Sequence, residues 1–185
     1  DRGELQLTDY GISGIPVFQV SRYASEALDR KKRVLAVLDF FPSLKDEELF
    51  LLLKEQRMYL SDRKAEGFLN GIFHKKLAAL FLKAAGIRGE EMAGRLSDKK
   101  LLAAAELIKR TVVEVTAANS FDKAQVCMGG VRVKDVDPCT MESRLVPGLY
   151  FAGEILDVDG ICGGYNLQWA WSSGYAAGAS ATGKE

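Results

Sequence analysis

The sequence is poor in the residues that metal centres and disulfide-stapled folds require. Its 185 residues include three cysteines and a single histidine, His74. The cysteines Cys127, Cys139 and Cys162 are odd in number and form no C-x-x-C pair. This argues against a disulfide framework and favours a reducing, cytoplasmic location. A protein metal site draws on several ligands, so no metal is expected, and a surface position is expected for His74.

The sequence also lacks an excess of either charge. It contains 25 basic and 25 acidic residues. Nucleic-acid-binding domains usually carry a basic stripe, so no nucleic-acid partner is expected. Residues 160–183 have no charged side chain, but they include Asn166, Gln168 and many glycines and serines. A membrane-spanning helix needs about 20 mostly apolar residues, so no membrane partner is expected either, and the composition is that of a soluble globular protein.

The first third of the chain predicts short strands and one helix. Residues 3–8 alternate in polarity, which is typical of a strand. A helix is predicted to follow, with Ser13 as its cap and Pro16 in its first turn, where a missing N–H costs nothing. Residues 33–40 form a compact apolar run and predict a buried strand.

Residues 43–110 change to the helical period and predict a small helical unit. Ser43 followed by Asp46 is similar to a capping box. Apolar residues at helical spacing predict a second helix over residues 69–84, closed by a left-handed Gly86. Ser97 is predicted to cap a third helix, because serine oxygens accept bonds from the first-turn amides.

The strand period returns after residue 110. Residues 111–117, 123–133 and 149–153 each predict a strand. Gly129 and Gly130 interrupt the second of these and indicate a bulge or a close backbone approach. Residues 164–179 predict a helix packed closely against another element, since its second half leaves little side-chain bulk at Gly174, Ala176, Ala177, Gly178 and Ala179.

The expected fold class is therefore α+β, with a helical unit between strand-forming segments. Four segments are predicted: part of a β-domain with one helix, a helical insertion, the return of the β-domain, and a final strand–loop–helix. Their bounds are residues 1–41, 42–110, 111–146 and 147–185. Residues 1–7 begin with no Met and with strand-like alternation, so the chain is expected to be an excerpt of a longer protein.

The end of the chain carries the pattern that most clearly indicates a ligand-binding site. A strand-like segment stops at Gly153, an acidic loop follows, and a helix is predicted to begin near the adjacent Gly163 and Gly164. Helix N-termini expose unpaired N–H groups with partial positive charge, and glycines let a flat ligand approach the backbone. Carboxylates such as Glu154 and Asp159 accept hydrogen bonds from sugar-like hydroxyls. A flavin consists of a flat ring joined to a polyol chain. A flavin site is therefore one interpretation of this pattern, and a tight turn before a core helix is the other.

Other patterns are weaker. Residues 157–160 (DVDG) are similar to the start of a calcium loop, but the glycine comes too early and Gln168 stands where such loops carry Glu. Cys162 has no partner thiol, which favours a packed side chain over redox chemistry. Trp169 and Trp171 are two positions apart in the predicted helix, so they are expected to point in different directions, with core packing favoured over a stacking platform.

A family resemblance covers most of the chain. It is carried by GELQLTDYGISGIPVFQVSR at residues 3–22, by AQVCMGGVRVKDVDPCTMESRLVPGLYFAGE at 124–154, and by VPGLYFAGEILDVDGICGGYNLQWAWSSGYAAG at 146–178. These segments resemble the HI0933-like (BaiN-type) flavoprotein family of NAD(P)/FAD-dependent oxidoreductases. The resemblance implies a two-dinucleotide-binding-type FAD domain, a barrel-like β-domain and a helical insertion.

The resemblance also implies cofactor-binding residues. Gly153 and Glu154 stand where related flavoproteins place a Gly-Asp pair against the ribityl chain. The helix start would face the pyrimidine edge of the isoalloxazine and stabilise negative charge there. The residues expected in that role are Gly163, Gly164, Tyr165 and Asn166.

The family's first FAD element has no counterpart in this sequence. That element is a strand, a turn with the pattern G-x-G-x-x-G, and a helix. No such run occurs in the 185 residues, so the isolated chain is expected to bind FAD weakly or not at all.

The leading hypothesis is part of an FAD-dependent oxidoreductase with NAD(P)H as electron donor and a small-molecule acceptor, and with no catalytic side chain in this segment. The isolated chain is expected to be inactive and prone to self-association through exposed strand edges. The alternative is a non-enzymatic interaction module with a structural remnant of a flavin domain.

Overall fold

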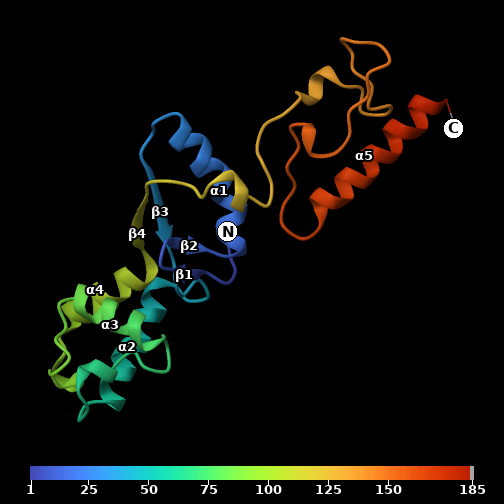
Figure 1. The fold of residues 1–185 in the computed structure, drawn as a ribbon. Coiled ribbons are helices and arrows are strands. Elements are labelled where there is room, and N and C mark those ends of the chain that lie inside the picture. The colour runs from blue at the N-terminus through green and yellow to red at the C-terminus, as the bar shows by residue number, and fades with distance from the viewer. Residues whose placement is uncertain (184–185) are drawn as a thin grey trace. The chain divides into compact units, whose positions relative to one another are not determined.

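The computed structural model describes residues 1–183, and Figure 1 shows its helices and strands along the chain. Residues 34–115 form one compact unit, and the segments before and after them form the other. Helices are combined with two small two-stranded sheets, in agreement with the predicted α+β class.

The unit of residues 34–115 begins and ends with a β-ribbon. Strands β3 (Val34–Leu38) and β4 (Thr111–Val115) are antiparallel, and Val34 is paired with Val115. Both strands were predicted. The predicted burial of the first is wrong, since Val37 is 61% exposed; a ribbon of two strands covers neither of its own faces.

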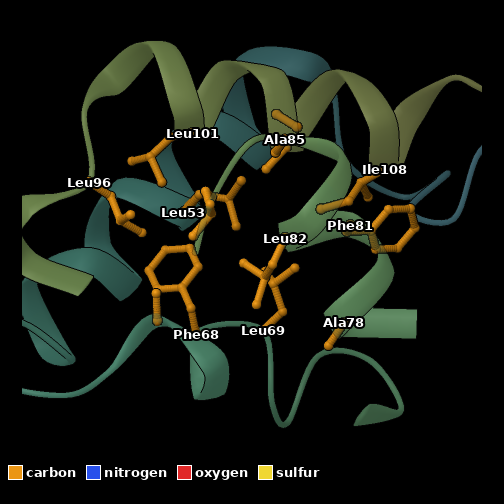
Figure 2. Packing of buried hydrophobic residues seen from close by; sticks show 14 of the residues in the cluster. Leu53, Phe68, Leu69, Ala78, Phe81, Leu82, Ala85, Leu96, Leu101 and Ile108 are labelled. Atoms are coloured by element: carbon orange, nitrogen blue, oxygen red, sulfur yellow. The ribbon is translucent and has the colours of Figure 1, made fainter. Parts of the chain in front are cut away.

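Three helices lie between the two strands: α2 (Asp46–Tyr59), α3 (Lys75–Ala84) and α4 (Asp98–Lys109). Two 3₁₀ turns connect them, η1 (Ala65–Gly67) and η2 (Ala93–Arg95), and an antiparallel bridge between Lys64 and Met92 brings these turns together. Figure 2 shows how leucine and phenylalanine side chains from all three helices and their connections meet in one core. Its fully buried large members are Leu49, Leu53, Phe68, Leu69, Phe81, Leu96, Leu101 and Ile108.

The helix ends in this unit test three predictions. Gly86 has a φ of +69° and Ile87 N–H donates to Leu82 O over 2.8 Å, so the predicted left-handed end of α3 is confirmed. Ser97 caps α4 as predicted. The predicted cap at Ser43 is wrong, because α2 begins three residues later, where Glu48 Oε2 accepts a bond from Lys45 N–H.

The second unit begins with a hairpin of β1 (Gln6–Thr8) and β2 (Gly11–Ser13), followed by α1 (Ile15–Asp29). Pro16 lies buried in the first turn of α1, as predicted. The predicted cap at Ser13 is wrong, since this residue ends β2 and Gly14 precedes the helix with a φ of +105°. A Cβ at Gly14 would overlap the Glu4 carbonyl oxygen, so only glycine fits there.

The C-terminal part of this unit has fewer strands than predicted. In residues 116–183 the structure has the 3₁₀ turns η3 (Phe121–Lys123), η4 (Val133–Asp135) and η5 (Gly153–Ile155), and one helix, α5 (Tyr165–Thr182). The strands predicted over residues 123–133 and 149–153 are wrong; what remains of them is isolated bridges, between Val131 and Leu156 and between Glu142 and Tyr150. The final helix is confirmed, and no described helix is long and apolar enough to span a membrane.

Candidate functional site

The beginning of α5 presents backbone amides for which the described residues supply no acceptor. Gly164 precedes the helix with a φ of +90°, and its carbonyl accepts the first helical bond, from Gln168 N–H at 2.9 Å. Within residues 1–183, no protein acceptor is found for the amides of Tyr165 and Asn166. A Cβ at Gly164 would meet no atom within 4 Å. The approach to these positively polarised amides is therefore open.

The loop that leads into α5 is held by two polar clamps. Asn166 Oδ1 accepts from Gly160 N–H at 2.7 Å, and its Nδ2 donates back to the Gly160 carbonyl at 3.1 Å. One residue earlier, Asp159 Oδ1 accepts from Arg22 Nη1 of α1 at 2.6 Å. Asp159 is mostly buried, so the acidic loop has a fixed counter-charge.

Gly153 is fastened to the middle of α5. Its N–H donates to Ser173 Oγ at 2.9 Å, and its carbonyl accepts from Trp169 Nε1 at 3.2 Å. Ser173 is 2% exposed and donates in turn to the Trp169 carbonyl. Gly153, at one end of the predicted cofactor-binding segment, is thereby fixed to the helix that begins at the other end of that segment.

The two nearby carboxylates of η5 and its loop bind a neighbouring segment. Glu154 Oε1 accepts from Cys127 N–H at 2.7 Å, and Asp157 Oδ1 accepts from Gly129 N–H at 3.2 Å. The next residue, Gly130, passes so close to the Ile155 carbonyl that a Cβ would overlap it. The predicted close backbone approach at this glycine pair is confirmed.

These features set what the site can hold. Open amides, with no Cβ at Gly163 or Gly164, suit the carbonyl edge of a flat polar ring, so the donor set fits the pyrimidine edge of a flavin. Glu154 and Asp159 each bind a protein donor through one oxygen, which leaves the other oxygen for hydroxyl groups. The roles of Gly153, Glu154, Asp159, Gly163, Gly164, Tyr165 and Asn166 in cofactor binding stay predictions.

The sequence reasoning missed the residues that support the site. Ser173, Trp169 and Arg22 contact it only through the folded structure, and Arg22 is 137 positions from its partner. No local signal in the sequence separated the buried Ser173 from its exposed neighbour Ser172. The half-buried Trp169 and the exposed Trp171 do point to different sides, as predicted.

Other candidate residues are not gathered into a site. His74 is exposed and accepts from Lys76 N–H at the start of α3. The three cysteines are free thiols. No cluster of histidine, cysteine and carboxylate side chains suited to a metal ion occurs in the part of the chain that the structure describes.

Comparison with known proteins gives consistent matches along the chain. Residues 78–180 match the family model described as HI0933-like protein Rossmann domain, and residues 1–126 match the HI0933-like protein barrel and H2TH domain. A 3-dehydro-bile acid delta(4,6)-reductase of Clostridium scindens is 44% identical over 98% of this chain and 44% of its own length. Ribosomal RNA dihydrouridine synthases of Haemophilus influenzae and Escherichia coli are 34% and 32% identical over 96% and 95% of the chain. The chain spans less than half of each relative, 42% and 41% for the two synthases.

Proposed function

This chain belongs to the HI0933-like family, and from that premise we propose that it is part of an FAD-dependent oxidoreductase. The observation that carries the proposal is the open, glycine-flanked start of α5, which lies inside the segment that matches the family's Rossmann domain. The NAD(P)H donor, the cytoplasmic location and the small-molecule acceptor belong to the same proposal.

Residues of α5 and η5 would hold the flavin end of the cofactor. The amides of Gly164, Tyr165 and Asn166 would donate to a ring carbonyl oxygen, and the positive end of the helix would favour negative charge there. The second oxygens of Glu154 and Asp159 would accept from hydroxyl groups. When bound, FAD supplies the hydride chemistry, while the protein supplies position and electrostatics.

The names of the relatives support a substrate class. A dihydrouridine synthase saturates a carbon–carbon double bond of uridine, and a delta(4,6)-reductase acts on double bonds at positions 4 and 6 of a 3-dehydro bile acid. In both substrates the double bond is conjugated with a carbonyl group. We therefore propose an α,β-unsaturated carbonyl compound as the acceptor, reduced at its double bond.

The test uses the full-length protein that contains this chain. We expect a yellow protein whose colour is bleached by NADH or NADPH and restored by a 3-oxo-4-ene steroid or by uridine. Bleaching without reoxidation by either compound would refute the substrate class but not the flavoprotein. A colourless protein that copurifies with a macromolecular partner would refute the enzyme and favour the interaction module. The 185-residue chain alone, titrated with FAD, is expected to give no tight, saturable quenching of flavin fluorescence.

A further inference from the structure

We propose that Arg22 of α1 is a positioning residue for the flavin site: it anchors the loop that aims the α5 amides and balances the carboxylate beside them. This inference rests on the proposed FAD site and names a residue for it outside the C-terminal segment. Arg22 and Asp159 lie in the same compact unit, and Arg22 Nη1 is 2.6 Å from Asp159 Oδ1.

The bonds form a continuous path from α1 to the amides. Arg22 holds Asp159, the adjacent Gly160 is clamped twice by Asn166, and Asn166 belongs to the first turn of α5. The first-turn amides are therefore joined to the loop through Asn166, and the loop is joined to α1 through Arg22.

The charges of Arg22 and Asp159 predict a measurable effect on the reduction potential of the bound flavin. Asp159 is 17% exposed and Arg22 39% exposed, so solvent screens the pair only in part. Without the guanidinium, the Asp159 carboxylate would stand uncompensated near the start of α5. It would oppose the negative charge that the ring edge gains on reduction. Without the carboxylate, the guanidinium would favour that charge.

A purely structural ion pair predicts something different. It would make both single substitutions loosen the loop, and both would weaken FAD binding without moving the reduction potential in opposite directions. Exposed ion pairs contribute little to stability on average, so stability alone does not distinguish the two roles. The reduction potential of the bound flavin does.

The experiment compares full-length variants by spectroelectrochemical titration and FAD affinity. Arg22→Met is expected to lower the flavin reduction potential and to weaken FAD binding about tenfold, as for loss of a charge-assisted hydrogen bond. Asp159→Asn is expected to raise the potential, and the double variant to return close to the parent value. Arg22→Lys keeps the charge and is expected to stay near the parent. Arg30→Met removes an ion pair with Glu26 at the C-terminal end of α1 and is the control, with no expected change.

Each result decides the question. Single variants that leave the potential unchanged, or shift it in the same direction, would overturn the role of Arg22. If Arg22→Met does not fold, the near-isosteric Asp159→Asn decides alone, because its potential must rise. A full-length parent without flavin would refute the proposed function itself, before any variant is compared.

Discussion

Replacing Ser173 by alanine removes the hydroxyl that joins Gly153 to α5. Ser173 Oγ accepts from Gly153 N–H at 2.9 Å and donates to the Trp169 carbonyl at 2.6 Å, in a position that is 2% exposed. The carbonyl is already part of the helix, whereas the Gly153 amide has no other acceptor in the described residues. The cost is therefore dominated by one partly buried donor left unpaired, the Gly153 amide, and is about 1–3 kcal/mol.

This loss of stability can be measured on α5 itself. Both tryptophans of the chain, Trp169 and Trp171, lie in α5, so tryptophan fluorescence during urea unfolding follows this part of the molecule. With a denaturant dependence of about 2 kcal/mol per molar urea, a loss of about 2 kcal/mol lowers the midpoint by about 1 M.

The neighbouring serine provides the control. Ser172 is exposed, and its Oγ accepts from Gln168 Nε2 within the same helix. Ser172→Ala is expected to change the free energy of unfolding by no more than about 0.5 kcal/mol. Equal midpoints for Ser172→Ala and Ser173→Ala would show that the Gly153 amide finds water instead, and the argument for this contact would be wrong.

Three further outcomes are expected. Leu53→Ala should destabilise the helical unit by about 2–5 kcal/mol in thermal or urea unfolding followed by circular dichroism, because Leu53 is fully buried, while Leu51→Ala on the outer face of α2 should have little effect. The Lys100 ammonium and the Arg88 amide lower the pKa of Glu91 to about 2. The ionised Glu91 therefore stabilises the folded state above the ordinary pKa near 4.5, and this stabilisation is lost as the pH falls toward 2. Glu91→Gln should flatten the acid side of the plot of unfolding free energy against pH, and an unchanged slope would contradict this. Gly174→Ala should stabilise α5 in the 185-residue chain by about 0.5–1 kcal/mol, since a Cβ there meets nothing within 4 Å; a lower urea midpoint would contradict it.

Local signals predicted where helices form and predicted the strands β3 and β4, but they failed for the strands expected over residues 123–133 and 149–153. Ser97, Gly86 and the glycines before α5 act on neighbouring residues, so the sequence around them was sufficient. The apolar alternation over residues 123–133 predicted a strand, but a strand also requires a paired neighbour along its length. In the described residues only Val131 of that stretch is paired, and the left-handed Gly129 and Gly130 break the extended backbone.

In the candidate site too, features formed by adjacent residues could be predicted, and contacts between distant residues could not. The glycine pair and the helix start could be identified from their order along the chain, because they are adjacent. The anchoring of Asp159 by Arg22 and of Gly153 by Ser173 could not, because each joins residues that only the fold brings together. Glu154 was expected to be open to a ligand, and its bond to the Cys127 amide could not be foreseen from spacing.

The chain enters and leaves the helical unit through one two-stranded ribbon, formed by β3 and β4. The chain enters at Val34 and leaves at Val115, which are register partners, and the strands end with Leu38 opposite Thr111. A segment whose two ends meet in this way can be cut out and the gap sealed by a short hairpin turn, without rethreading anything else. Such a module is free to be exchanged, enlarged or lost while the rest of the polypeptide keeps its connections.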